Sequence, residues 1–240
     1  MSKYYASYSE YEHTQIILEN DFKHEETNTI INNLNQFHEP NGKHFNVLLG
    51  YEIYTEKLVI DRGVFFPSLV SQWFAKILDD EKLNGLVIEY GVGSGILTRV
   101  LSKHASFVLG IDISYKATQL AKKNCLASNN VTFITCDLGD CLVGVNSNHL
   151  VFNMPFFFHP NPKGINKSWY HHGELFINKM MSSAKRICPN GTFHFLYSTL
   201  CPIMSTYFME KCDSCVCVKS LGMGKEKILY CQIKMDEFKG

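Results

Sequence analysis

The chain has 240 residues, 45% of them hydrophobic, which excludes a wholly disordered protein and provides enough apolar side chains for one sizeable domain. Lys and Arg total 23, as do Asp and Glu, so the formal net charge is zero and argues against a dedicated nucleic-acid binder, in which a basic face supplies the affinity. The sequence shows no apolar run of about 18 residues and no signal-peptide pattern at its start, so neither a membrane span nor secretion is predicted.

The first 60 residues differ from the rest and are predicted to form an N-terminal extension. Residues 1–45 are polar but carry a narrow apolar stripe that predicts one or two short amphipathic helices. Apolar and polar residues then alternate over 45–60, which predicts a β-ribbon with a turn near Gly50. We expect residues 1–60 to act as a lid or docking extension, and residues 61–240 to form the main domain.

The main domain alternates predicted strands and helices. A helix is expected over 68–78, directly after Pro67. Strands are then predicted over 86–90, 107–112, 131–134, 149–153 and 192–197, with helices over 96–104, 115–128 and 175–188. Two further strands, over 216–221 and 228–235, flank a turn near Gly222 or Gly224. This alternation predicts an α/β fold with a doubly wound parallel sheet that ends in an antiparallel hairpin.

A glycine-rich turn, Glu89-Tyr90-Gly91-Val92-Gly93-Ser94-Gly95, joins the first of these strands to its helix. Glycines allow a sharp turn and let a ligand approach main-chain N–H groups. Asp112 ends the next predicted strand, 21 residues after Gly91, where a carboxylate can accept hydrogen bonds from two ribose hydroxyls. Asp137 follows the third strand, within reach of an adenine edge. Together these residues predict a nucleoside pocket at the carboxyl ends of the strands.

A second polar turn, Asn153-Met154-Pro155-Phe156-Phe157-Phe158, leaves the fourth strand. A side-chain amide and main-chain carbonyls can accept hydrogen bonds from an NH₂ group, and Pro155 fixes the carbonyl before it. Phe156 offers a flat face for a planar substrate, while Phe157 and Phe158 are equally consistent with the core. The loop therefore predicts a site that orients a planar nitrogen rather than one that deprotonates it.

The residues from Val87 to Gly95, followed by Gly110-Ile111-Asp112-Ile113-Ser114, resemble the first two motifs of the class I S-adenosylmethionine-dependent methyltransferases. This resemblance covers about residues 60–235 and implies a Rossmann-like seven-stranded methyltransferase sheet, with S-adenosyl-L-methionine as the cofactor. It implies that Glu89 and the glycine turn hold the methionine end, Asp112 the ribose and Asp137 the adenine. The cofactor-binding residues expected from it are Glu89, Gly91, Gly93, Gly95, Asp112, Ile113, Asp137 and Asn153.

The second turn resembles the Asn-Pro-Pro-Tyr/Phe motif of amino-group methyltransferases, which include release-factor glutamine methyltransferases and enzymes that modify amino groups of guanine and adenine in RNA. We accordingly expect Asn153, Pro155 and Phe156 to be catalytic. Met154 stands where that motif has its first proline, and residues 65–69 lack the Arg-Pro-Glu-Thr-Glu signature of the glutamine enzymes. Residues expected to contact the acceptor are Met154, Phe157, His171 and His172. A linker cap is the favoured alternative for the two histidines.

These features predict a cytoplasmic methyltransferase that acts on a planar nitrogen (an amide, guanidine or amino group) of a small molecule or protein side chain. A nucleobase amino group in RNA or DNA is the second acceptor class, because the neutral charge gives little support for a nucleic-acid partner. A non-catalytic cofactor-binding subunit and an aminopropyl-transferring enzyme remain as alternatives. A homodimer is a further expected partnership, and no membrane partner is expected.

The nine cysteines, an odd number, fit reduced thiols better than a disulfide-bonded secreted scaffold. Cys212 and Cys215 have the spacing of half a zinc site, but no second close pair accompanies them. Valines interleave with Cys215 and Cys217, which favours a β-strand. The ten histidines contain no metal-binding pattern, so no metal is predicted.

Overall fold

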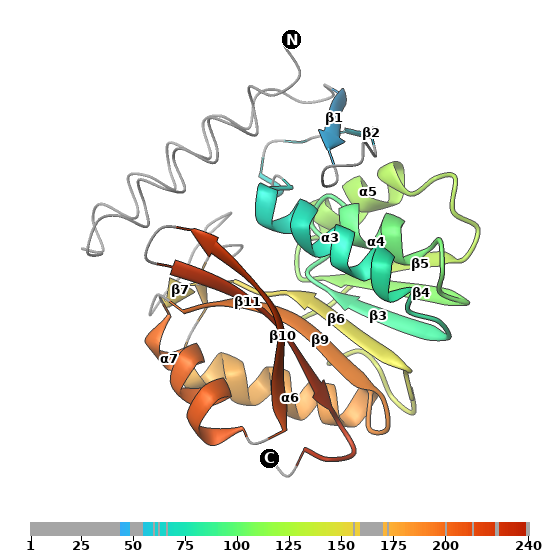
Figure 1. Cartoon of the computed structure of the whole chain (residues 1–240). Coiled ribbons are helices and arrows are strands. Elements are labelled where there is room, and N and C mark those ends of the chain that lie inside the picture. The colour runs from blue at the N-terminus through green and yellow to red at the C-terminus, as the bar shows by residue number, and fades with distance from the viewer. Residues whose placement is uncertain are drawn as a thin grey trace.

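A computed structural model gives the structure of the chain, which is drawn in Figure 1. The structure describes residues 44–48, 55–59, 61, 63–65, 67–155, 157–158, 170–171, 173–199, 201–212, 214–223 and 226–238. The amphipathic helices predicted within residues 1–43 lie outside this set, as do Phe156, His172 and the hairpin turn at 224 and 225.

A seven-stranded mixed sheet forms the centre of the molecule, with the strands in the order β10-β11-β9-β6-β3-β4-β5 (Figure 1). The strands are β3 (Leu86–Tyr90), β4 (Phe107–Asp112), β5 (Val131–Thr135), β6 (His149–Asn153), β9 (Thr192–Ser198), β10 (Cys215–Met223) and β11 (Glu226–Lys234). β11 runs antiparallel to both of its neighbours, and the other pairings are parallel. The predicted α/β fold, Rossmann-like with seven strands, is therefore confirmed, including its closing hairpin.

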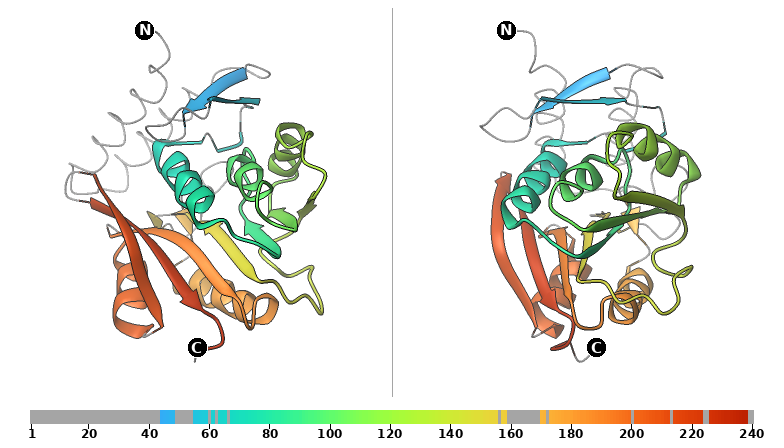
Figure 2. Two further views of the ribbon diagram at one scale, coloured as in Figure 1. Left: turned by 45° about the vertical axis from the view of Figure 1, so that its right-hand side comes forward. Right: turned by 90° about the vertical axis from the view of Figure 1, so that its right-hand side faces the viewer.

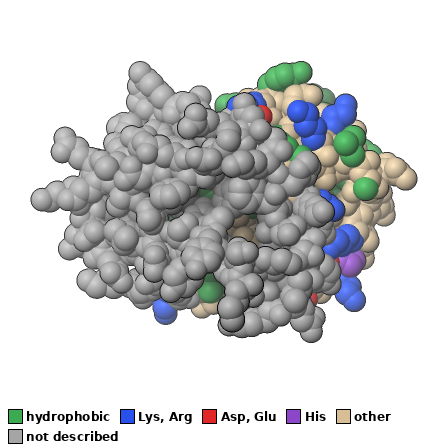
Figure 3. Space-filling view, turned by 90° about the horizontal axis from the view of Figure 1, so that it is seen from above, with side chains coloured by type: hydrophobic (Ala, Val, Ile, Leu, Met, Phe, Trp, Pro, Cys, Tyr) green, Lys and Arg blue, Asp and Glu red, His purple; other side chains and the backbone are tan. Residues whose placement is uncertain are grey.

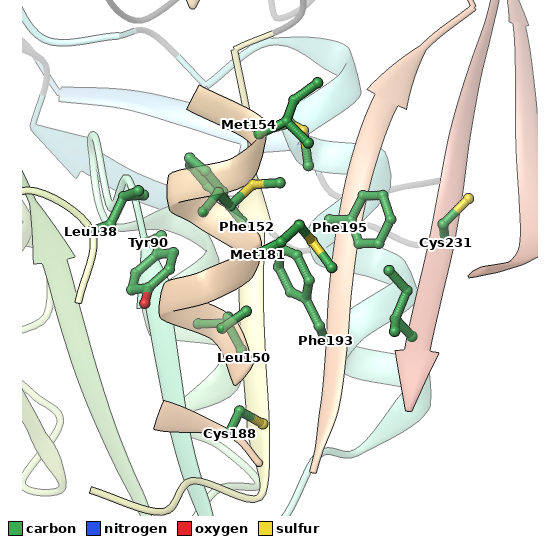
Figure 4. Packing of buried hydrophobic residues seen from close by; sticks show 14 of the residues in the cluster. Tyr90, Leu138, Leu150, Phe152, Met154, Met181, Cys188, Phe193, Phe195 and Cys231 are labelled. Carbon is green, nitrogen blue, oxygen red and sulfur yellow. The ribbon is translucent and has the colours of Figure 1, made fainter. Parts of the chain in front are cut away.

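Helices cover both faces of this sheet (Figures 1 and 2). One layer consists of α3 (Leu69–Glu81), α4 (Ile96–Leu101) and α5 (Tyr115–Asn124). The other contains α6 (Glu174–Ile187), α7 (Pro202–Ser205) and the short π-helix η2 (Thr206–Lys211). Two large buried clusters follow from this layering, and Figure 4 shows part of the one beneath α6, with Tyr90, Phe152 and Phe195 packed together. Both faces of the sheet are thus apolar, which explains the continuous hydrophobic runs in its parallel strands.

Local sequence signals explain where most of these elements begin and end. Ser68 caps α3, since its hydroxyl accepts a hydrogen bond from the Ser71 N–H at 3.3 Å. The helix predicted over 115–128 ends earlier, at Asn124. Here the Asn124 side-chain amide bonds to backbone groups of Val59 and Ser94, so this residue connects α5 to neighbouring segments. Helix α4 likewise ends at Leu101, three residues before its predicted end, and residues 202–211 form helices that were not predicted.

The predicted β-ribbon is present as β1 (His44–Leu48) and β2 (Thr55–Val59), which pair antiparallel. The ribbon is attached to the main domain at its second strand. Val59 exchanges two hydrogen bonds with the Asn124 side chain, at 2.7 and 3.0 Å, and Leu58 is fully buried among residues of α3 and α4. The division of the chain at residues 60 and 61 stays a prediction, but β2 packs with the domain that follows it.

Candidate functional site

The carboxyl ends of three parallel strands meet at one edge of the sheet. β3 lies between β4 and β6, and its residues pair in parallel register with both strands. This arrangement brings Glu89, Asp112 and Asn153 to the same edge, although up to 64 positions separate them in the sequence. Asp137 follows β5, the next strand outward, at the same edge. The structure therefore brings together the polar residues that the sequence predicted at the strand ends.

The glycine-rich turn between β3 and α4 depends on left-handed backbone conformations. Gly91, Gly93 and Gly95 have φ values of 64°, 50° and 84°. At Gly95 space is also limited, because a Cβ would lie 3.0 Å from the Cα of Ala121 in α5. These positions suit glycine, and the tight turn leaves main-chain groups at the strand edge for a ligand.

Asp112 connects this turn to the end of β4. One carboxylate oxygen accepts from the Gly93 N–H at 3.0 Å, and the other accepts from the Ser114 N–H at 2.8 Å. Burial raises the pKa of Asp112, while these two hydrogen bonds act in the opposite direction. The carboxylate is thus held in a fixed orientation beside the turn. Ile113, by contrast, is 54% exposed and offers an apolar side chain at the rim.

Glu89 is the most deeply buried charged group at this edge, with 1% of its surface exposed. One carboxyl oxygen accepts a hydrogen bond from the Thr98 hydroxyl, and the other has no partner among the described residues. Burial raises the pKa of Glu89 to about 8; the bond from Thr98 opposes this rise and the nearby Asp112 charge adds to it. A buried carboxyl with one unpartnered oxygen is suited to a cationic ligand group, which would favour its charged form.

Asp137 lies in a more exposed position. Its carboxylate forms an ion pair with Lys179 of α6 at 2.6 Å, and the same ammonium contacts Asp140 at 2.7 Å. Gly139 lies between the two aspartates, and its N–H donates to the Ser183 hydroxyl at 3.2 Å. The loop after β5 is therefore fixed onto α6, with Asp137 at the surface.

Asn153 ends β6 and is oriented by a residue from a distant helix. Its side-chain NH₂ donates to the Ser71 hydroxyl of α3 at 3.1 Å. Its side-chain carbonyl oxygen is buried and has no hydrogen-bond partner in the described part of the chain. An unpaired buried acceptor costs free energy, so this oxygen has a strong requirement for a donor.

The residues predicted to contact the acceptor lie in different environments. Met154 is 2% exposed, and its side chain packs in the core near Phe152 and Met181 (Figure 4). Pro155 is half-buried. The backbone of β7 (Phe157–Phe158) pairs in parallel with β8 (Tyr170–His171), so Phe157 and His171 lie on adjacent short strands. Phe156 and His172 lie outside the described residues, and their predicted roles remain predictions.

Three supporting contacts were not predicted from the sequence: those that Thr98, Ser71 and Lys179 make with predicted site residues. Each of the three residues lies in a different helix and contacts one predicted site residue. Thr98 lies in the helix after the glycine turn, only nine positions from Glu89. Of the three contacts, this one was the easiest to predict from the sequence. The contacts of Ser71 and Lys179 depend on how helices pack against the sheet, for which the sequence contains no local signal.

Residues 87–171 match the family model of a methyltransferase domain. The matched segment contains the glycine turn, Asp112, Asp137 and Asn153. A comparison with curated proteins found no match. The site fits S-adenosylmethionine: the unpartnered Glu89 oxygen and the oriented Asp112 carboxylate are acceptors for an ammonium group and for ribose hydroxyls.

Solved structures share the fold. The ribosomal protein L11 methylase of Lactobacillus delbrueckii subsp. bulgaricus has a TM-score of 0.53 at 18% identity, over 72% of this chain and 83% of its own. Methanocaldococcus jannaschii Trm5, solved with adenosine, has a TM-score of 0.59 at 20% identity, over 83% of this chain and 57% of its own. The tRNA m1G37 methyltransferase of M. jannaschii has a TM-score of 0.56 at 20% identity, over 83% and 58%. This chain spans just over half the length of the last two.

Two further findings concern membranes and metals. No helix in the described ranges has both the length and the apolar character to cross a membrane. Within the same ranges, no group of three or more His, Cys, Asp or Glu side chains is placed to hold a metal ion. Cys215 and Cys217 lie in β10, as the strand interpretation predicted.

Proposed function

We propose that this methyltransferase acts on a planar nitrogen and that Asn153 holds this nitrogen. The main support is the side-chain carbonyl oxygen of Asn153, which is buried and unpartnered among the described residues. The Ser71 hydroxyl accepts from the NH₂ of the same side chain, which leaves the oxygen as the group that receives a donor. An N–H of an amide, guanidine or amino group is a suitable donor.

The residues of the acceptor loop orient this nitrogen. The Asn153 oxygen accepts one N–H, and the main-chain carbonyl of Met154, fixed by Pro155, accepts a second. Phe156 covers one face of the planar group. When bound, S-adenosylmethionine supplies an electrophilic methyl group on a sulfonium. Orientation of the nitrogen lone pair is the chief contribution of the loop. The carbonyl acceptors stabilise the positive charge that develops on nitrogen, and the proton that the nitrogen loses passes to solvent.

The cofactor-binding half of the site has a separate role. We assign the ammonium group to Glu89, the ribose to Asp112 with Ile113 alongside, and the adenine edge to Asp137. The glycine turn with Gly91, Gly93 and Gly95 lies against the methionine end. The unpartnered Glu89 oxygen supports this assignment: burial raises the pKa of Glu89 to about 8, and an adjacent ammonium would favour the carboxylate.

Our first choice of acceptor is an amide or guanidine nitrogen on a small molecule or protein side chain, in the cytoplasm. A nucleobase nitrogen is the second candidate, and charge distribution is the observation in its favour. Helices α4 and α5 carry Arg99, Lys122 and Lys123 in their last turns. Figure 3 shows basic side chains gathered on the described part of the surface, with few acidic ones. A basic face of this kind suits a phosphate backbone. The tRNA m1G37 methyltransferase has the same fold.

A methyl-transfer assay with labelled S-adenosylmethionine tests the proposal. The acceptor panel contains amide and guanidine compounds, protein extracts treated with nuclease, and total RNA treated with protease. We expect label on nitrogen in one class, and loss of labelling with Asn153→Ala. Label on oxygen or carbon, or full labelling by the variant, would contradict the proposal. Label in RNA alone would replace the first acceptor class by the second.

A further inference from the structure

The loop between β5 and β6 carries two cysteines in contact with each other. Cys136 is half-buried directly after β5, and Cys141 is exposed. The main-chain N–H of Cys141 donates to the Cys136 sulfur at 3.0 Å.

Asp137 lies inside the loop that these two cysteines close. Cys136 also contacts the cofactor half through its backbone, because its N–H donates to the main-chain carbonyl of Asp112 at 2.9 Å. The turn is closed by a hydrogen bond from the Asp140 N–H to the Asp137 carbonyl at 3.2 Å. Any covalent bond between the cysteines therefore constrains a loop that begins beside Asp112 and contains Asp137.

We propose that Cys136 and Cys141 form a dithiol modification site that a peroxide converts to a disulfide, and that this conversion weakens cofactor binding. The second part rests on the proposed placement of Asp137 at the adenine. The hydrogen bond from the Cys141 N–H to the Cys136 sulfur brings the two residues together, and a disulfide needs about 2.05 Å between the two sulfurs. Formation of the bond must move the Cys141 end of the loop toward Cys136, and this movement displaces the turn that holds Asp137.

The chemistry proceeds in two balanced steps. The Cys136 sulfur attacks one oxygen of hydrogen peroxide: an S–O bond forms, the O–O bond breaks, and the leaving hydroxide takes the thiol proton as water. The Cys141 sulfur then attacks the Cys136 sulfur: an S–S bond forms, the S–O bond breaks, and a second water leaves with the Cys141 proton. Two thiols lose two electrons and one peroxide gains them.

The environment of each sulfur favours this order. Partial burial and contact with the Cys136 sulfur raise the pKa of Cys141 to about 11, so this thiol keeps its proton at neutral pH. Cys136 receives the main-chain N–H and is the sulfur that reacts first. Cys141 is exposed and adjacent, which suits the residue that resolves the intermediate.

The hairpin at the other side of the protein provides a matched control. Cys217 lies directly opposite Cys231 in the β10–β11 pairing, and Cys217 is exposed. This second cysteine pair lies far along the sheet order from β5. A general sensitivity to oxidation would affect both pairs, whereas the proposal concerns only the first.

The experiment treats the full chain with hydrogen peroxide and then maps disulfides by mass spectrometry and measures S-adenosylhomocysteine affinity by calorimetry. We expect a peptide in which Cys136 and Cys141 have lost two hydrogens, and an affinity about fivefold weaker, the size of one misplaced hydrogen bond. Dithiothreitol should restore the affinity. Cys141→Ser should prevent both changes, and Cys217→Ser should show both.

Absence of the Cys136–Cys141 disulfide in the wild type, or the same loss of affinity in Cys141→Ser, would overturn the proposal. Formation of the disulfide with unchanged affinity would overturn its second part. Asp137→Ala, measured without peroxide, then identifies the reason: unchanged affinity in this variant too means that the adenine assignment fails, whereas weaker affinity means that the disulfide does not move Asp137.

Discussion

The two proposed halves of the site are held together by contacts that differ greatly in sequence separation. In the cofactor half, Glu89 and Thr98 are nine positions apart, and Gly93 and Asp112 are 19 apart. In the acceptor half, Asn153 is oriented by Ser71, which is 82 positions away. The Glu89 and Asp112 part of the cofactor half therefore forms within one strand-turn-helix-strand unit, to which the loop after β5 adds Asp137. The acceptor half needs the packing of α3 against the end of β6.

This difference suggests a division of labour. A short, backbone-dominated half suits a constant ligand, because its groups are fixed by the turn and by main-chain N–H donors. A half that depends on side chains from distant elements adapts to a new acceptor by changes in a few residues. Substitutions in the cofactor half should therefore lower cofactor affinity, and substitutions in the acceptor half should lower turnover.

The largest effect is expected for Asn153→Ala. Loss of the group that orients the acceptor should lower turnover by about 10²-fold or more, while cofactor affinity moves by less than about 1 kcal/mol. Steady-state kinetics with the acceptor from the labelling panel and calorimetry with S-adenosylhomocysteine measure the two quantities. Ser71→Ala removes only the orienting hydroxyl and should lower turnover less, with unchanged cofactor affinity. Equal losses of affinity and turnover in Asn153→Ala would place this residue in the cofactor half instead.

Asp112→Ala should weaken cofactor binding by about 1.5–3 kcal/mol, because hydrogen bonds to a charged group are lost. The same change also frees the Gly93 and Ser114 N–H groups, so thermal unfolding of the variant is the necessary control. A folded variant with wild-type affinity would show that the ribose lies elsewhere.

Cofactor affinity should also depend on pH through Glu89. Its pKa of about 8 in the free protein means that the carboxyl is mostly protonated at pH 7, and a bound ammonium requires the charged form. Affinity for S-adenosylhomocysteine should therefore rise with pH up to about 8, by at most about tenfold per pH unit. Glu89→Gln should bind more weakly and show a flatter pH profile. A wild-type affinity independent of pH between 6 and about 8 would be incompatible with this role.

The smallest expected effect concerns stability and involves the paired histidines His149 and His194. It should leave cofactor affinity and turnover unchanged. His194 bonds to His149 at 3.1 Å and to the Tyr230 hydroxyl at 2.9 Å, and burial lowers its pKa to about 3. The unfolded chain takes up a proton near the ordinary histidine pKa of about 6.5, but the folded chain does not until the pH approaches 3. Stability is therefore fully present above about pH 6.5 and falls as the pH drops below it.

For His194 alone, the loss should reach about 1.4 kcal/mol between neutral pH and pH 5.5. Urea unfolding at the two pH values measures it, and His194→Gln should lose that much less on acidification. The control is His104→Gln, whose ring contacts Asp79 near the surface. Identical acid sensitivity of wild type and His194→Gln would contradict this explanation.

The same contrast between short-range and long-range contacts explains which features could be predicted from the sequence. The seven strands and the glycine turn follow from local periodicity and from glycines at left-handed positions. The polar residues at the strand ends follow from the parallel alternation, which places all carboxyl ends at one edge. The fold and the grouping of Glu89, Asp112 and Asn153 were thus accessible from short-range signals.

Long-range packing was not accessible. Nothing in the sequence near Asn153 points to Ser71, and the burial of Met154 in the core depends on how α6 and η2 pack on the sheet. Residues 202–211 were missed because their apolar side chains, Met204 and Phe208 among them, occupy a segment too short to show helical periodicity. The shortened end of α5 reflects a tertiary role of Asn124, which outweighs local helix propensity.

The most direct test of this division is a calorimetric titration of S-adenosylhomocysteine into wild type, Asp112→Ala and Asn153→Ala under identical conditions. We predict clear binding by wild type, affinity lower by about 1.5–3 kcal/mol for Asp112→Ala, and a change below about 1 kcal/mol for Asn153→Ala. Equal affinities for all three proteins, or a larger loss in Asn153→Ala than in Asp112→Ala, would contradict the assignment of the two halves.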